Sequence, residues 1–253
     1  MREEIKLGRL TRMIWSGAEW QGKDQFPAWQ CWADECEQIL TFLEAQGQFG
    51  RYLNRLRGGI SERDGALSEA RVSWWFQRNG FRITRWEPKA TTNPGEIEIQ
   101  WRDEQPIFVE VKTRTFGAEL TKEEIAAGRQ HEPRYPKNPQ GRWIDNDEQV
   151  ICAAFKAKPK FAPDRPNLLV VCERLFVSPL DMLNEELVRS TIGTPGFDPL
   201  GAILCFDAIS KSEHIEYRTL LIENPRAKGK PWEIPRPVAE GLGQSTSSRK
   251  RPR

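Results

Sequence analysis

The stretch GEIEIQWRDEQPIFVEVK, residues 95–112, decides the fold of this chain. Apolar and charged residues alternate on both sides of a short polar turn, which is typical of a β-hairpin. Because successive side chains on a strand point to opposite faces, one face should be apolar and packed in the core. The other face should be charged yet partly covered, because Phe108 falls among its polar residues. The expected core face consists of Ile97, Ile99, Val109 and Val111, and the expected charged face of Glu96, Glu98, Glu110 and Lys112.

The composition is that of a globular protein with one main domain. The 253 residues are 38% hydrophobic, which is enough to bury a sizeable core. No apolar run reaches the ~18 residues of a membrane helix, and the charged N-terminus lacks the apolar region of a signal peptide. We therefore expect a cytoplasmic protein without a membrane partner. The five cysteines are odd in number and form no CxxC pair, so neither a disulfide framework nor a zinc ribbon is predicted.

Positive charge is concentrated at the C-terminus. The formal net charge is +2, but without the four basic residues at the very end the chain has 34 basic and 36 acidic residues. Any affinity of the folded part for nucleic acid must therefore come from a local patch. We expect residues 241–253 to form a disordered basic tail, with non-specific phosphate contact as the alternative interpretation. The four residues are Arg249, Lys250, Arg251 and Arg253.

Residues 1–58 are predicted to form a helical extension, because apolar residues recur at helix-like intervals. Gly58 and Gly59 then separate it from a main domain at 59–240. Two interpretations of the tryptophans in this extension stay open. They pack in the core of a helical cap, or they form a surface for a protein partner or for base stacking. These tryptophans are Trp15, Trp20, Trp29 and Trp32.

The main domain is predicted to begin with a helix and a strand. Ser61 or Asp64 can cap a helix that runs to about Asn79. Gly80 can take the left-handed conformation that ends a helix, and a strand over 81–86 should follow.

The hairpin comes next, and a second helix and strand are predicted after it. A helix from about 146 to 158 is stopped by Pro159, and an apolar strand of the buried type follows at 167–172. The fold class is therefore α/β, with a mixed central sheet flanked by helices in the order helix, three strands, helix, strand. Further elements are expected at 179–189 (helix), 202–206 (strand) and 217–222 (strand).

The polar stretch 115–145 is longer than structureless loops normally are in a compact domain, which indicates a functional loop or a short helix near 121–127. It mixes basic and aromatic residues, which suits contacts with a phosphate backbone and with bases. A merely solvated loop is the alternative. The candidate nucleic-acid contacts are Arg134, Tyr135, Lys137, Arg142 and Trp143.

Two carboxylates held together on neighbouring strands require a cation or a shared proton, because their like charges repel. Carboxylate oxygens suit Mg²⁺, which also keeps waters and substrate phosphate oxygens as ligands. Such an ion lowers the pKa of a bound water and neutralises the charge that builds on a phosphate. Lys112 would then orient the attacking water or contact the phosphate. The predicted chemistry is metal-assisted phosphodiester hydrolysis.

These residues resemble the restriction-endonuclease-like, or PD-(D/E)xK, phosphodiesterases over about residues 61–173. In that superfamily, a helix with a glutamate precedes a hairpin with an acidic residue, and Glu-x-Lys follows on the next strand. Here Leu67-Ser68-Glu69 resembles part of the leading helix, Pro94-Gly95-Glu96 the acidic turn, and Glu110-Val111-Lys112 the signature tripeptide.

The resemblance implies a role for each of five side chains. Glu96 and Glu110 would bind the metal, with help from Glu69 directly or through water. Lys112 would position the nucleophile, and Gln149 on the following helix would be auxiliary.

The first acidic ligand is where the chain departs from the family pattern. The family usually has aspartate at the position of Glu96, and the longer side chain moves the carboxylate by about one C–C bond. Glu98 is therefore an alternative metal ligand. The implied cofactor is Mg²⁺, for which Mn²⁺ can substitute.

The implied activity is that of an endonuclease, and DNA is expected over RNA because most relatives act on DNA. Restriction, anti-phage defence and DNA repair are all compatible with it, as is a homodimer or larger complex formed through the N-terminal helices. The alternative is a non-catalytic nuclease-like scaffold that binds a protein partner or nucleic acid. Other chemistries fit worse, because the chain has only two histidines, no Gly-rich phosphate loop and no nucleophile elbow.

Overall fold

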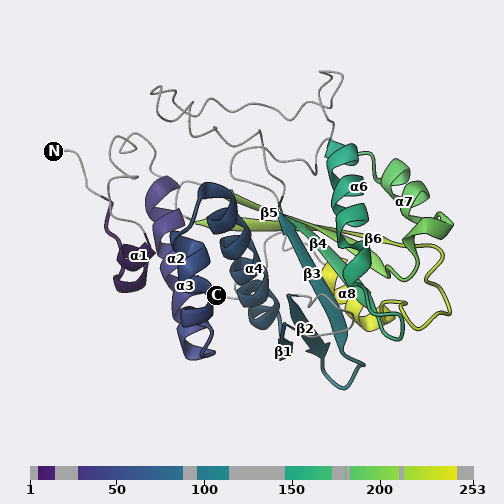
Figure 1. The fold of residues 1–253 in the computed structure, drawn as a ribbon, viewed down its shortest axis with the longest axis horizontal. Helices are drawn as coiled ribbons and strands as arrows, with labels where there is room; N and C mark the ends of the chain where they lie inside the picture. Colours follow the sequence, from purple (N-terminus) through teal and green to yellow (C-terminus); the bar gives the residue numbers. More distant parts are fainter. Residues whose placement is uncertain are drawn as a thin grey trace, which may run out of the picture.

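A mixed sheet of six strands forms the centre of the part of the chain that the structure describes (Figure 1). The structure is a computed structural model that describes residues 5–14, 28–87, 96–113, 146–172, 180, 183–210 and 214–243. Neighbouring strands follow in sequence order, with antiparallel hairpins at both edges and parallel pairing of β3 with β4 and of β4 with β5. The predicted α/β class with a mixed sheet is confirmed. The strands are β1 (Phe81–Trp86), β2 (Ile97–Trp101), β3 (Ile107–Thr113), β4 (Asn167–Cys172), β5 (Ala202–Ser210) and β6 (Ile215–Glu223).

The hairpin of β2 and β3 has the faces that its alternating pattern predicts. Ile97 lies opposite Val109, and Glu98 lies opposite Phe108. The four predicted core residues of the hairpin all belong to one buried cluster, in which Trp75 and Phe76 of a helix pack on the sheet. Phe108 is buried in a second cluster on the opposite face, so the charged face is covered as expected.

Helices cover both faces of the sheet (Figure 1). The α4 helix and the C-terminal α8 pack on the face that carries Ile97 and Val109. The α6 and α7 helices, together with the short η2 and η4 turns, pack on the face that carries Phe108. The elements of these two layers are α4 (Ile60–Arg78), α8 (Arg236–Gly243), α6 (Asn146–Ala157), η2 (Lys158–Lys160), α7 (Glu185–Ile192) and η4 (Pro195–Phe197).

The predicted N-terminal helical region is present as α1 (Arg9–Ile14), α2 (Ala28–Ala45) and α3 (Phe49–Arg57), which share a core with α4. A buried polar network also joins it to the sheet. Arg71 of α4 donates to Glu35 of α2 at 2.7 Å, and Tyr217 of β6 donates to the same carboxylate. Trp32 is buried beneath the Arg71 guanidinium, 5.1 Å from it, so for this tryptophan the core interpretation holds.

Some predicted boundaries were wrong. The α4 helix begins at Ile60, with Gly59 at its N-cap and no side-chain cap, so Ser61 and Asp64 lie inside the helix. The α7 helix begins at Glu185 rather than near residue 179, because the Asn184 side chain accepts a hydrogen bond from the Leu187 N–H and caps it. Gly80 was predicted correctly, since its φ of 88° ends α4 before β1.

Several predictions concern residues outside the described part of the chain. The five candidate nucleic-acid contacts between 134 and 143 lie there, as do the expected short helix near 121–127 and residues 244–253 of the predicted tail. Residues 241–243, which were predicted to belong to that tail, instead form the end of α8. Trp15 and Trp20 also lie there. In the described residues, no helix combines the length and the apolar character that crossing a bilayer requires.

Candidate functional site

Glu96 and Glu110 are neighbours across the β2–β3 hairpin. The Glu96 N–H donates to the Val109 carbonyl at 3.2 Å, one position before the Ile97–Val109 pair, so the antiparallel register sets Glu96 beside Glu110. The Glu110 side chain is fully buried, because β3 lies inside the sheet under helices on both faces, and the Glu96 side chain is 14% exposed. Two carboxylates are therefore held together in a largely dry environment.

Two lysines meet one oxygen of Glu110. Lys112, two residues further along β3, places its Nζ 2.5 Å from Glu110 Oε1, and Lys160 places its Nζ 2.7 Å from the same atom. Lys160 also lies 3.5 Å from Glu96 Oε1, so its ammonium links the two carboxylates. The second oxygen of Glu110, Oε2, is buried and accepts no hydrogen bond from the described residues.

Glu69 forms the third acidic position of the cluster. It is buried on α4, and the guanidinium of Arg55 on α3 donates a hydrogen bond to each of its two carboxylate oxygens at 2.5 Å. Burial and the neighbouring Glu69 charge raise the pKa of Glu96 to about 7, against the opposing effect of Lys160. Burial also raises the pKa of Glu110, although Lys112 opposes it. The site thus holds carboxylates that are costly to keep charged and that attract cations.

Glu98 does not join this cluster. Its carboxylate accepts hydrogen bonds from Thr84 Oγ1 of β1 at 2.8 Å and from Arg165 Nη1, just before β4, at 2.9 Å. Gln149 is partly buried in the first part of α6, one helical turn before Ala153 of the buried face.

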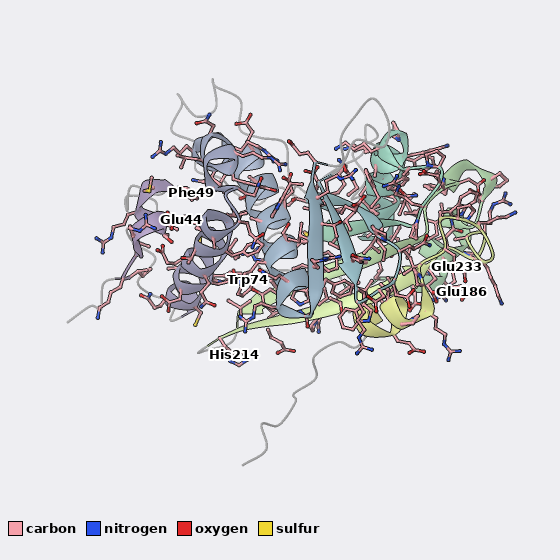
Figure 2. The ribbon with its side chains drawn as sticks, turned by 90° about the horizontal axis from the view of Figure 1, so that it is seen from below. Glu44, Phe49, Trp74, Glu186, His214 and Glu233 are labelled. Atoms are coloured by element: carbon pink, nitrogen blue, oxygen red, sulfur yellow. The ribbon has the colours of Figure 1, made fainter. Side chains whose placement is uncertain are left out.

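The described residues contain no ready-made metal site with three ligands. No three acidic, histidine or cysteine side chains within them are grouped closely enough to hold a metal ion. Instead, cations of the protein neutralise each of the three carboxylates. His131 lies outside the described residues, and His214 is exposed just before β6, well apart from Glu186 and Glu233 in Figure 2.

The donor set nevertheless fits a hard divalent cation. The atoms are carboxylate oxygens, and the buried Oε2 of Glu110 is a strong acceptor that no described donor satisfies. A buried acceptor of this kind costs free energy until a cation or a proton donor meets it. The chemistry of the residues is therefore compatible with Mg²⁺ at Glu96 and Glu110.

Sequence reasoning missed the two cations that complete the cluster, Lys160 and Arg55. The connection between the parallel strands β3 and β4 must cross back over the sheet through α6, so the segment after α6 is expected near the start of β4. That topology locates residue 160 roughly. Nothing in the local sequence Lys158-Pro159-Lys160 indicates that the second lysine, rather than the first, faces Glu110.

Comparisons with known proteins give one remote likeness. No family model and no curated protein matches the chain. Among solved structures, SfsA of Pyrococcus furiosus, in complex with Ca²⁺, aligns at 17% sequence identity with a TM-score of 0.26. The alignment covers 61% of this chain and 61% of that chain. A likeness at this level establishes no family, so membership of the PD-(D/E)xK superfamily stays a prediction.

Proposed function

We propose that the protein is a metal-dependent phosphodiesterase, most simply a Mg²⁺-dependent endonuclease acting on DNA. The observation that carries the proposal is the Glu96–Glu110–Lys112 arrangement. Two buried carboxylates lie side by side, one of their oxygens is unsatisfied within the described residues, and an ammonium lies 2.5 Å from the central carboxylate. Such a set is what metal-assisted attack on a phosphodiester requires.

Each side chain has a separate part in this proposal. Glu96 and Glu110 would hold Mg²⁺, and Glu69 would support them through the negative charge that it adds. The ion, when bound, supplies charge neutralisation and a water of lowered pKa. Lys112, which is 27% exposed, can reach both the buried carboxylate and solvent, so it would orient the attacking water or contact the phosphate. Gln149 would be auxiliary.

The biological setting is proposed from the family resemblance. The resemblance is compatible with restriction, anti-phage defence and DNA repair, and DNA is preferred to RNA on the same ground. Assembly into a homodimer or a larger complex through the N-terminal helices is part of this proposal, as is a cytoplasmic location.

A second function is favoured by the ion pairs of the site. Arg55 grips Glu69, and Lys160 lies between Glu96 and Glu110, so the cluster is electrically balanced without a metal. A nuclease-like scaffold that has lost catalysis and binds a protein partner or nucleic acid would have such a site.

Cleavage assays separate the two functions. Purified protein should cut DNA with Mg²⁺ or Mn²⁺, and Glu110→Gln and Lys112→Ala should each lower the rate at least about a hundredfold. Glu223→Gln, at an exposed position of the edge strand β6, is the control for loss of one negative charge. Circular dichroism and a thermal transition near that of the wild type would show that the variants are folded. Unchanged cleavage by both site variants would refute the proposal, and a wild type that neither cuts DNA nor binds Mn²⁺ would favour the scaffold.

A further inference from the structure

Lys160 is a second lysine in the cluster, in addition to the lysine of the Glu-x-Lys tripeptide. It belongs to η2, immediately after α6, whereas Lys112 lies on the same strand as Glu110. Its Nζ is 2.7 Å from Glu110 Oε1 and 3.5 Å from Glu96 Oε1. Of the described cations, it therefore pairs with both carboxylates of the proposed metal site.

The ammonium of Lys160 is held in its charged form. Its Nζ forms ion pairs with the carboxylates of both Glu110 and Glu96, and two adjacent negative charges favour the charged ammonium. Its side chain is only 23% exposed, so water screens these interactions weakly. A positive charge thus lies within contact distance of the oxygens that a divalent cation would use.

We propose that Lys160 is an internal counter-ion that competes with the metal. In the metal-free protein it neutralises Glu96 and Glu110 and keeps them in place, and it must give up these contacts when a divalent cation binds. Lys160 therefore weakens metal binding while it stabilises the metal-free fold. The inference rests on the proposed function, because it assumes that these two carboxylates are the metal ligands.

Two like charges cannot occupy the same carboxylate pair without strong repulsion in a poorly solvated site. Removing the ammonium should consequently raise metal affinity, whereas removing an exposed lysine that contacts neither carboxylate should leave metal affinity unchanged. Lys158 offers a matched control, because it lies two residues earlier in the same short turn and is exposed.

The test uses full-length wild type, Lys160→Met and Lys158→Met, with Mn²⁺ alone as the probe. Calorimetric titration should show Mn²⁺ binding to Lys160→Met at least about tenfold more tightly than to wild type, with Lys158→Met like wild type. In EDTA, Lys160→Met should melt at a lower temperature than wild type, because Glu110 has lost a counter-ion. Added Mn²⁺ should raise its melting temperature by more than that of wild type.

Lys160→Gln serves if Lys160→Met fails to fold, because the amide can still donate to Glu110 without a charge. Equal or weaker Mn²⁺ binding by the Lys160 variant would overturn the inference. The proposed function would survive that result if wild-type binding disappears in Glu110→Gln. Mn²⁺ binding by neither wild type nor the Lys160 variant would overturn both, whereas binding gained only by the variant would support the competition.

Discussion

Replacing Glu96 with Gln should remove a pH-dependent loss of stability from the metal-free protein. The pKa of Glu96 is about 7 in the folded chain, against an ordinary value of 4.5, because the carboxyl is buried and faces Glu69. Lys160, Arg55 and Lys112 face it as well and reduce the shift. A difference of this size corresponds to roughly 3 kcal/mol, since one pKa unit is ~1.4 kcal/mol.

Whether stability rises or falls with pH depends on which state, folded or unfolded, releases the Glu96 proton first. Below pH 4.5 the carboxyl is protonated in both the folded and the unfolded chain, so the shift has no effect on stability. As the pH rises from 4.5 to about 7, the unfolded chain loses the proton before the folded chain does, and the free energy of unfolding falls. Well above pH 7 the carboxyl is ionised in both states, so the free energy of unfolding falls no further. Most of the ~3 kcal/mol should therefore disappear between pH 5 and pH 8.

Urea denaturation in EDTA, followed by tryptophan fluorescence at several pH values, measures this effect. The difference between wild type and Glu96→Gln isolates Glu96, because both proteins share all other titrating groups. Glu223→Gln controls for the change in net charge. Parallel stability curves for wild type and Glu96→Gln, or a wild type that gains stability relative to the variant as the pH rises, would refute the assignment of a strained carboxylate at this position.

Two further outcomes are expected. In calorimetry, Glu98→Gln should bind Mn²⁺ within about twofold of wild type, because Thr84 and Arg165 hold Glu98 outside the cluster. Glu96→Gln should bind Mn²⁺ at least about tenfold more weakly than wild type. The reverse order of affinities would make Glu98 the first metal ligand. Arg71→Met should lower the free energy of unfolding in urea by about 3–5 kcal/mol, because it leaves the buried Glu35 without its guanidinium. A Glu35→Leu/Arg71→Met double variant should recover most of that loss, and a loss below about 1 kcal/mol in the single variant would show that the pair is not effectively buried.

The hairpin could be predicted from the sequence because its signal is local. Alternation with a period of two sets the faces, and the position of Phe108 indicates that the charged face is covered. The register that sets Glu96 beside Glu110 comes from the structure and was not part of the prediction. The sequence pattern alone could not separate Glu96 from Glu98, because both fall on one face; in the structure Glu98 lies opposite Phe108 and contacts Thr84 and Arg165.

The cations of the site could not be predicted, because they depend on long-range packing. Arg55 reaches Glu69 from a different helix, and Lys160 approaches Glu110 after a crossover between strands. The predicted start of α4 was wrong as well, because no local capping residue marks it. The α4 helix begins at Ile60 without a side-chain cap, and α2, β1 and β3 pack against it.

The clamp of Arg55 on Glu69 bears on how this protein can be divided. Arg55 lies in α3, ahead of the glycine pair, while every acidic residue of the cluster comes after it. A fragment trimmed to the segment that resembles a nuclease would keep the acids and lose one of their guanidinium partners. The α3 helix thus supplies a side chain to the acidic cluster, so a fragment made to study that cluster should retain α3.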